Sequence, residues 1–281
     1  MKLSDIILIV SEYLSGEIPE PDLSAKYIVS EVLGVKIPEL VFMGDREISD
    51  YTFKKILKLA KRRAKNEPLQ YIFGKAYFRN LSLKVGNGVL VPRPETETLV
   101  EIALRETPAN ASICEIGCGS GAISLAFASE RPDSKVFASE ISSSAIKYAR
   151  KNKKGLLIKN AFFYNGDLFA PFSGKKFHAI LANLPYVTSA EMKKLPREIS
   201  DHEPHLALDG GKGGIDIVKR FFVEAPKYAI ENAFIIAEVS PPQTTKLKKF
   251  LAKDIAYSNL HILKDLCGRK RFITARLNQS N

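Results

Sequence analysis

The first 73 residues show apolar positions three and four apart, the spacing that is typical of amphipathic helices. A first helix is predicted before Gly16, on the apolar residues Leu3, Ile6, Ile7, Val10, Tyr13 and Leu14. A second helix should begin near Pro21 and end at Gly34, burying Leu23, Ile28, Val32 and Leu33. Ser49 is expected to cap a third helix, whose apolar face includes Phe53, Ile56, Leu57 and Ala60. These segments predict a small helical domain over residues 1–73.

The third predicted helix also carries a dense row of positive charges, made up of Lys54, Lys55, Lys58, Lys61, Arg62, Arg63 and Lys65. Such a row is usual for a solvated helix face, and it is equally suited to contact RNA or an acidic partner. Both interpretations are open at this point.

Residues 74–92 predict a β-hairpin linker, because they alternate in polarity and contain the turn sequence Gly86-Asn87-Gly88. Pro92 and Pro94 then stiffen the chain, and the acidic and apolar pattern that follows predicts a helix through Leu104. The remainder, residues 93–281, is expected to form one larger domain.

Within this larger domain, short apolar runs alternate with helical patterns. The runs are 112–116, 135–139, 161–164, 177–182, 233–239, 260–263 and 272–277. This alternation predicts the α/β fold class, with a seven-stranded, doubly wound and mostly parallel sheet. Only residues 264–271 separate the last two runs, and so short a connection requires antiparallel pairing.

The first run leads into a glycine-rich turn and the start of a helix. Glycines allow a ligand to approach the backbone closely, and a helix N-terminus offers free N–H groups. The spacing Gly117-x-Gly119-x-Gly121 matches neither the Walker pattern nor the dinucleotide fingerprint, so a plain tight turn is the alternative. The candidate cofactor residues at this turn are Glu115, Gly117, Cys118, Gly119, Ser120 and Gly121.

Acidic residues follow the next two runs. Glu140 ends the second run, where a carboxylate can accept hydrogen bonds from two ribose hydroxyls. After the third run, Asp167 is suited to accept from an adenine amine, and Leu168 to pack against the ring. Each acid alone is more often a turn or cap residue. Their shared place at the carboxyl ends of parallel strands predicts an adenosine-containing ligand above the sheet.

The fourth run ends in Asn183-Leu184-Pro185-Tyr186. The segment presents an amide, a backbone carbonyl in a proline-held turn and an exposed aromatic face, which together form a clamp for a planar nitrogen. These four residues are the candidate catalytic residues, and Asn183 is also a candidate cofactor contact. From the residues alone, the nitrogen belongs either to a base or to an amide.

The composition of the chain bears on its cellular compartment and on its binding partners. The net charge of +11 suits RNA or a nucleoprotein, and equally a merely basic surface. The three cysteines form neither a disulfide framework nor a paired metal motif, so we expect a reducing compartment and no metal site. Since no apolar span approaches the roughly 20 residues of a membrane helix and no cleavable leader is apparent, a cytoplasmic location is expected.

Further motifs are Gln70-Tyr71-Ile72-Phe73-Gly74, Val91-Pro92-Arg93-Pro94-Glu95-Thr96-Glu97, Glu203-Pro204-His205-Leu206-Ala207-Leu208 and Gly210-Gly211-Lys212-Gly213-Gly214-Ile215-Asp216. With the clamp and the helical N-terminal domain, they resemble the release-factor glutamine methyltransferases, the PrmC or HemK family of class I S-adenosylmethionine-dependent methyltransferases. Leu184 departs from the second proline of that family's Asn-Pro-Pro-Tyr, and Glu140 stands where Asp is common. In the family the residue at position 184 offers a backbone carbonyl, which any residue can supply.

This resemblance implies an enzyme that uses S-adenosyl-L-methionine to methylate the glutamine amide of the Gly-Gly-Gln motif in peptide chain release factors. It also implies a substrate-recognition role for the N-terminal domain. The candidate residues of a substrate loop are Arg93, Glu95, Glu203 and Pro204. Two alternatives are a ribosomal RNA adenine amino-group methyltransferase, whose motif is similar to Asn-Leu-Pro-Tyr, and a non-catalytic, cofactor-sensing RNA-binding protein.

Overall fold

The computed structural model describes residues 1–278 and divides into two compact units. The helical unit comprises Met1–Lys75 together with Pro196–His202, and the sheet unit comprises Ala76–Leu195 and the chain from Glu203 onward. The sequence places domain boundaries after residues 73 and 92. It contains no signal that assigns the short segment 196–202 to the helical unit.

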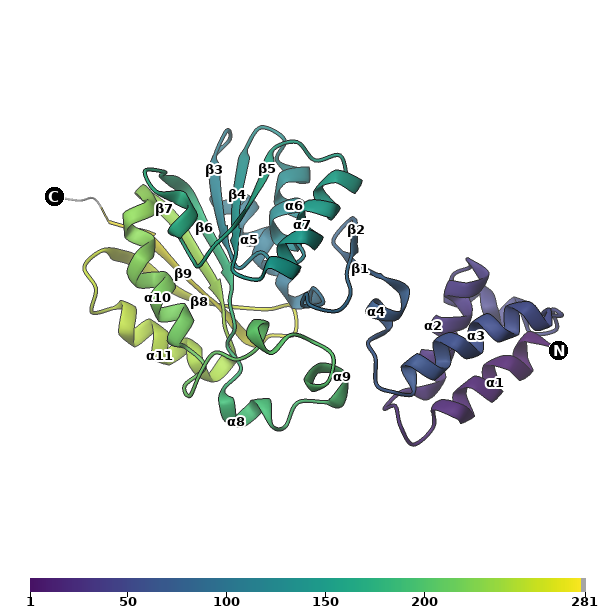
Figure 1. Cartoon of the computed structure of the whole chain (residues 1–281). Helices are drawn as coiled ribbons and strands as arrows, with labels where there is room; N and C mark the ends of the chain where they lie inside the picture. Colours follow the sequence, from purple (N-terminus) through teal and green to yellow (C-terminus); the bar gives the residue numbers. More distant parts are fainter. Residues whose placement is uncertain (279–281) are drawn as a thin grey trace. The chain divides into compact units, whose positions relative to one another are not determined.

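The helical unit is built from short helices, several of which Figure 1 labels. They are α1 (Leu3–Leu14), α2 (Pro21–Leu33), the 3-10 helix η1 (Ile37–Met43), α3 (Asp50–Arg63), α4 (Leu69–Phe73) and, from the distant segment, α9 (Arg197–Ser200). The Ser49 hydroxyl caps α3 by accepting a hydrogen bond from the Thr52 amide, and Gly34 ends α2 in the left-handed conformation. Both helix boundaries therefore confirm the sequence signals.

Two burial predictions in this unit are wrong. Leu23 is 39% exposed, while α2 buries Ala25, Ile28 and Val29. Leu23 lies five residues before Ile28, about 140° around the helix, and so it faces away from the core. Arg63 does not belong to the solvated basic row, because it is only 6% exposed. It follows Ala60 by three positions and therefore lies on the buried side of α3.

The buried Arg63 guanidinium has several partners within the helical unit. It donates to the Ser24 hydroxyl at 3.4 Å, to the Glu67 carbonyl at 3.0 Å and to the Glu198 carboxylate at 2.9 Å. His202 Nε2 lies 2.9 Å from the Lys65 carbonyl oxygen. These contacts tie the segment 196–202 to the end of α3.

The sheet unit confirms the predicted fold class. A two-stranded sheet is formed by β1 (Lys75–Phe78) and β2 (Leu81–Lys84). The seven-stranded sheet has the order β5-β4-β3-β6-β7-β9-β8, as Figure 1 shows. Its strands are β3 (Ser112–Ile116), β4 (Lys135–Glu140), β5 (Ala161–Asn165), β6 (Phe177–Asn183), β7 (Ala229–Glu238), β8 (Tyr257–Lys264) and β9 (Lys270–Leu277). The pairs from β5 to β7 are parallel, whereas β9 is antiparallel to both β7 and β8.

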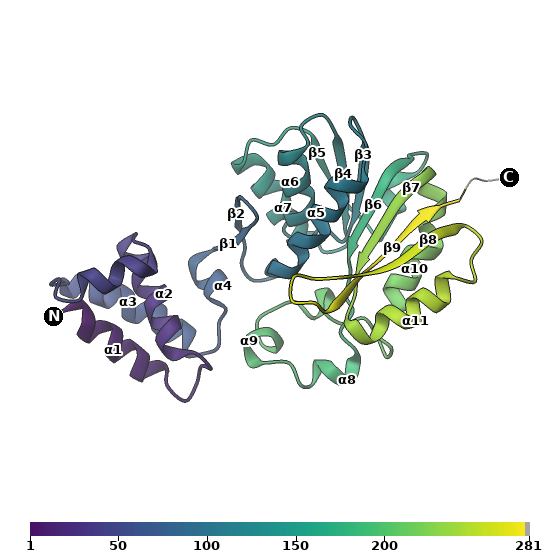
Figure 2. The same cartoon turned by 180° about the vertical axis from the view of Figure 1, so that it is seen from behind.

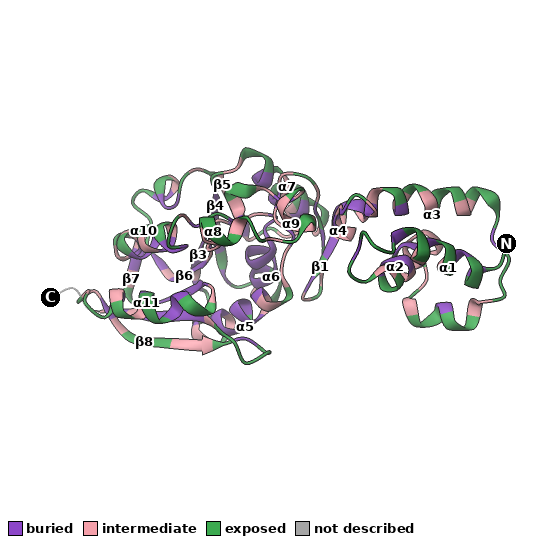
Figure 3. Cartoon of the chain, turned by 90° about the horizontal axis from the view of Figure 1, so that it is seen from below, coloured by how far each residue is buried: buried purple, intermediate pink, exposed green. Residues whose placement is uncertain are grey.

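Helices cover both faces of this sheet (Figure 2). One core joins the strands to α5 (Glu97–Glu106), α6 (Ala122–Glu130) and α7 (Ser143–Gly155), and the other joins them to α10 (Asp216–Glu224) and α11 (Pro241–Leu251). Neighbouring strand residues alternate between the two cores, with Ile113 in the first and Cys114 in the second. Figure 3 shows the resulting burial of α6, while α3 is exposed along one side.

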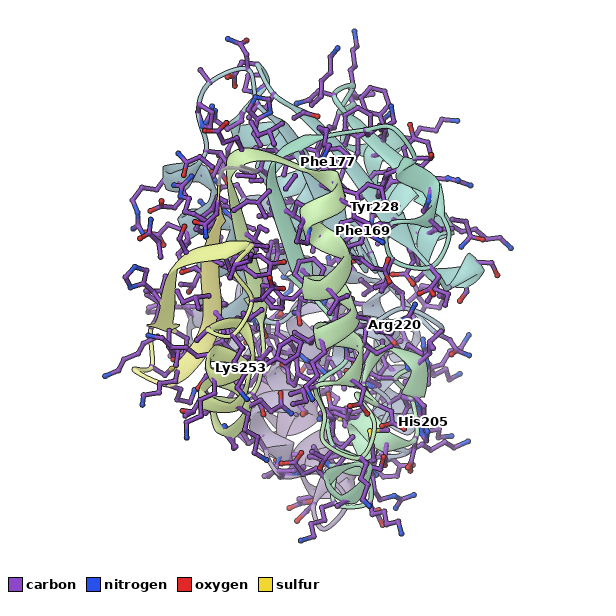
Figure 4. All side chains as sticks on the ribbon, turned by 90° about the vertical axis from the view of Figure 1, so that its left-hand side faces the viewer. Phe169, Phe177, His205, Arg220, Tyr228 and Lys253 are labelled. Atoms are coloured by element: carbon purple, nitrogen blue, oxygen red, sulfur yellow. The ribbon has the colours of Figure 1, made fainter. Side chains whose placement is uncertain are left out.

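Aromatic rings fill the second core beside α10, where Figure 4 labels Phe169, Phe177 and Tyr228. The rings of Phe169 and Tyr228 stack with centroids 4.8 Å apart, and Phe169 also stacks on Phe221. The unit's loops also contain short helices, which are η2 (Pro94–Thr96), η3 (Ala170–Phe172), α8 (Ser189–Met192), η4 (His205–Ala207) and η5 (Ala225–Tyr228). Among residues 1–278, no helix combines the length and apolar composition needed to cross a membrane.

The strand order places a switch point between β3 and β6. The chain leaves β3 for β4 and β5 on one side and then returns to pair β6 with the other side of β3. Crossovers in opposite directions open a crevice at the carboxyl ends of these two strands. Gly117 directly follows β3, and Asn183 is the last residue of β6, so both stand at this crevice.

Candidate active site

Three adjoining pockets in the sheet unit lie at the carboxyl ends of the parallel strands. The largest of the three, here called the cofactor pocket, has about 860 Å³ of empty space including its open mouth. The predicted site residues that line it are Gly117, Gly119, Glu140, Asp167, Leu168, Asn183, Leu184, Pro185 and Pro204.

The glycine turn adopts a backbone conformation that residues with side chains rarely adopt. Gly117, Gly119 and Gly121 have φ values of +77°, +53° and +83°. A Cβ on Gly121, the N-cap of α6, would lie 3.1–3.2 Å from side chains of Leu125, Ala149 and Phe163. Around Gly119, by contrast, a Cβ would find open space within 4 Å, which leaves that side of the turn free for a ligand.

Glu140 joins the glycine turn to the start of α7. Its carboxylate accepts hydrogen bonds from the amides of Gly119 and Ser142, each at 2.8 Å. Burial raises the pKa of Glu140, and these backbone hydrogen bonds oppose the shift. A carboxylate has about four acceptor positions, so two backbone donors leave capacity for ligand hydroxyls. The residue therefore has the chemistry that the sequence predicted for a ribose.

The next two predicted residues differ in exposure, because Asp167 is partly exposed and Leu168 is buried in the pocket wall. The Asp167 carboxylate is 47% exposed and forms an ion pair with Arg220 at 2.7 Å, the latter labelled in Figure 4. Leu168 is only 6% exposed and has φ +40°, a strained value for a branched-chain residue. With Ile141 and Ile217 it gives the cofactor pocket an apolar wall suited to an aromatic ring.

The second pocket contains the other predicted cofactor residues, Glu115, Cys118 and Ser120. Its full lining is Phe78, Leu90, Pro92, Arg93, Thr96, Glu115, Gly117, Cys118, Gly119, Ser120, Ala122, Ile123 and Asn183. The Glu115 carboxylate turns toward α6, where one oxygen accepts hydrogen bonds from both the amide and the hydroxyl of Ser124. Burial raises the pKa of Glu115 to about 7. Burial also raises the pKa of the Cys118 thiol. Cofactor contact by Glu115, Cys118 and Ser120 stays a prediction.

The third pocket, here the acceptor pocket, lies against the clamp and holds about 320 Å³ of empty space. It is lined by Leu90, Arg93, Asn183, Leu184, Tyr186, Val187, Ala207 and Leu208. Asn183 lines all three pockets and so stands where they meet. Tyr186 is half-buried rather than fully exposed, and its hydroxyl donates to Glu238 at 3.2 Å.

The clamp loop is held by Leu208, by the first glycine of the following motif, Gly210, and by Gln243. The Val187 amide donates to the Leu208 carbonyl at 2.9 Å, and the Gly210 amide donates to the Val187 carbonyl at 2.8 Å. The Gln243 side-chain amide donates to the Tyr186 carbonyl at 2.6 Å. Gly210 approaches so closely that a Cβ would lie 2.6 Å from the Pro185 carbonyl oxygen. The motif's first glycine is thus a packing requirement of the clamp.

The predicted substrate-loop residues form two ion pairs. Arg93 Nη2 lies 2.7 Å from an oxygen of the buried Glu203 carboxylate, and Arg93 also lines the acceptor pocket. Glu95 instead pairs with Arg269 at 2.8 Å. Pro204 lines the cofactor pocket. Their contact with a substrate stays a prediction.

Sequence reasoning missed several residues that surround the clamp. Thr96 accepts a hydrogen bond from the Asn183 side-chain amide at 3.0 Å and donates to Glu238 at 2.7 Å. Leu90 lines all three pockets. A signal existed for Glu238, because it is an acid near the end of an apolar run, one residue before the run 233–239 finishes, much as Glu140 stands at the end of the second run.

Comparisons with known proteins cover both units. The PrmC N-terminal domain family matches residues 6–74, and a methyltransferase domain family matches residues 108–206. A release factor glutamine methyltransferase from Thermodesulfovibrio yellowstonii is 36% identical, covering 91% of this chain and 92% of that protein. One from Coxiella burnetii is 33% identical, covering 95% of this chain and 96% of that protein.

Among solved structures, the chain is similar to a methyltransferase from Pyrococcus furiosus with a TM-score of 0.56. The sequences are 18% identical, and the match covers 78% of this chain and all of that one. At this identity the likeness concerns the fold, which is that of a methyltransferase.

Proposed function

The chain belongs to the family of release factor glutamine methyltransferases, and we propose that it transfers a methyl group from S-adenosylmethionine to the amide nitrogen of a glutamine in peptide chain release factors. The observation that carries this proposal is the position of Asn183 where the cofactor and acceptor pockets meet. The Gly-Gly-Gln motif is the proposed site on the release factor, and the helical unit is the proposed recognition module.

The cofactor pocket fits the three parts of S-adenosylmethionine. The Glu140 carboxylate has acceptor capacity for the ribose hydroxyls, and the apolar wall at Ile141 and Leu168 suits the adenine ring. The open side of Gly119 offers room for the amino-acid portion. When bound, S-adenosylmethionine supplies an electrophilic methyl group on a sulfonium centre.

The clamp provides what an amide nucleophile lacks. An amide nitrogen reacts poorly because its lone pair is delocalised into the carbonyl, so the protein must aim it. Asn183 Oδ1 and the Leu184 carbonyl accept the two N–H groups, and Tyr186 packs against the amide plane. Orientation of this kind lowers a barrier by up to roughly 7–11 kcal/mol in well-aligned systems.

The same two acceptors stabilise the positive charge that develops on the nitrogen during transfer. None of the chain's four histidines, all of which the structure describes, lines any of these three pockets. We therefore assign no general base.

The two alternatives are less favoured. The relatives that match nearly the whole chain are named for release factors, and the PrmC N-terminal match precedes the sheet unit in sequence. A non-catalytic sensor has no use for a clamp at the junction of two pockets. Because release factors act in translation, we propose a cytoplasmic location.

The proposal is tested by incubating the protein with labelled S-adenosylmethionine and either a release factor or ribosomal RNA, side by side. We expect label in the release factor, and none after its Gly-Gly-Gln glutamine is changed. Label that persists in that altered factor, or that enters only the RNA, would refute the assignment.

A second experiment addresses the clamp. Asn183→Ala should leave the Kd for S-adenosylmethionine nearly unchanged and lower kcat by about 10²–10³-fold, the usual effect of losing one polar group that stabilises developing charge. Unchanged turnover would remove Asn183 from the mechanism.

A further inference from the structure

A buried carboxylate lies directly behind the clamp. Glu238 is the last residue of β7, is paired in register with Asn183, and is 1% exposed. One of its oxygens accepts from the Thr96 hydroxyl at 2.7 Å, and the other accepts from the Tyr186 hydroxyl at 3.2 Å. Arg271 Nη1 lies 4.0 Å from the second oxygen. A single carboxylate therefore contacts Tyr186 directly and Asn183 through Thr96.

The chemistry of these groups fixes the direction of each hydrogen bond. Burial raises the pKa of Glu238, while the hydrogen bond from Thr96 and the charge of Arg271 oppose the shift and favour the ionised form. An ionised carboxylate only accepts, so Thr96 then donates its single proton to Glu238. At its contact with Asn183, 3.0 Å away, the Thr96 oxygen can then only accept. The Asn183 side chain must present its NH₂ group to Thr96. Its carbonyl oxygen is therefore directed away from Thr96.

We propose that Glu238 and Thr96 are positioning residues that set the orientation of the Asn183 amide and of the Tyr186 ring for methyl transfer. This inference rests on the proposed function. An Asn amide rotated by 180° has almost the same shape but would present an N–H group to the N–H of the substrate. The buried carboxylate removes that ambiguity through Thr96.

Substitutions at Thr96 separate this role from packing. Thr96→Val keeps the shape and removes the hydroxyl, so Asn183 loses the acceptor that selects one rotation. We expect kcat to fall by about 10- to 100-fold, with the Kd for S-adenosylmethionine within threefold of wild type. Thr96→Ser retains the hydroxyl and should recover most of the kcat that Thr96→Val loses.

A matched control lies two residues away. Thr98 is also buried, and its hydroxyl has no hydrogen-bond partner among residues 1–278. Thr98→Val should therefore keep kcat near the wild-type value. Glu238→Gln provides an independent variant, because its amide can donate to Thr96 and reverse the relay; kcat should again fall by about 10- to 100-fold.

The possible results distinguish a failure of the proposed function from a failure of the positioning role. If the wild-type protein fails to methylate any release factor, the proposed function fails. If wild type methylates it and Thr96→Val binds S-adenosylmethionine normally with unchanged kcat, the positioning role is wrong. Equal losses in Thr96→Ser and Thr96→Val would also overturn it. Should Glu238→Gln not fold, judged by loss of cofactor binding, the Thr96 pair decides.

Discussion

Replacing Gly210 with alanine offers a direct test of how the clamp is held. The added Cβ would lie 2.6 Å from the Pro185 carbonyl oxygen, 2.8 Å from the Tyr186 Cα and 2.9 Å from the Gly214 carbonyl oxygen. All three are backbone atoms, so no side-chain rotation relieves the contact. Ordinary contact begins near 3.4 Å, and the closest atom must therefore move by about 0.8 Å.

A displacement of this size matters more for catalysis than for stability. Overpacking costs about 1–3 kcal/mol, and each kcal/mol lowers the Tm of a protein of this size by roughly 2–4 °C. Misplacing a reacting group by about 1 Å costs on the order of 10²-fold in rate. Gly210→Ala should therefore lower kcat about a hundredfold while the protein remains folded at assay temperature.

The assay measures kcat for methyl transfer to a release factor, the Kd for S-adenosylmethionine and the Tm. Gly213→Ala is the matched control in the same motif, because a Cβ there would meet only an Ile215 side-chain atom at 3.7 Å. It should behave like wild type. The reasoning is refuted if Gly210→Ala keeps kcat within threefold of wild type, or if Gly213→Ala loses as much.

Three further predictions concern single side chains. Glu140→Ala should weaken S-adenosylmethionine binding about 10- to 100-fold, because a charged acceptor contributes about 1.5–3 kcal/mol; calorimetry measures this Kd, and an unchanged value would contradict the assigned role. Arg63→Met should lower the free energy of unfolding by about 1–3 kcal/mol, whereas Lys61→Met, at an exposed position of α3, should change it little in denaturant titrations; equal effects would contradict the burial argument. Burial raises the pKa of Glu115 from 4.5 to about 7, so the folded protein binds the carboxyl proton more tightly than the unfolded chain does. This difference stabilises the folded state fully below pH 4.5, and the stabilisation is lost as the pH rises to 7. Between pH 5 and pH 8, the free energy of unfolding of the wild type should fall by about 2.5 kcal/mol more than that of Glu115→Gln. Equal pH dependence in the two proteins would refute this prediction.

Periodicity in the sequence determined the elements. Apolar spacing and the signals at Gly34 and Ser49 fixed helix boundaries, because these depend on residues within a few positions of one another. The short apolar runs identified every strand of the main sheet, and the short final connection required antiparallel pairing. Strand ends then indicated Glu140 and the clamp, since parallel strands present their carboxyl ends at one edge.

Burial of single residues depended on rotation and packing that periodicity does not resolve. Leu23 is apolar yet exposed, and Arg63 is charged yet buried. The segment 196–202 belongs to the helical unit through contacts such as Arg63 with Glu198, which are 135 residues apart. Local sequence has no means of specifying such a pairing.

The tertiary structure alone decided what orients the clamp. Each of the residues Asn183, Thr96 and Glu238 is an ordinary polar residue in its own segment. The hydrogen-bonded pair Asn183 and Thr96 is separated by 87 residues, and the pair Thr96 and Glu238 by 142. Only the sheet order, which sets β7 beside β6, brings Glu238 level with Asn183. The sequence therefore indicated the candidate groups for holding a substrate nitrogen. The fold decided which way those groups face, because hydrogen-bond direction depends on neighbours that are distant along the chain.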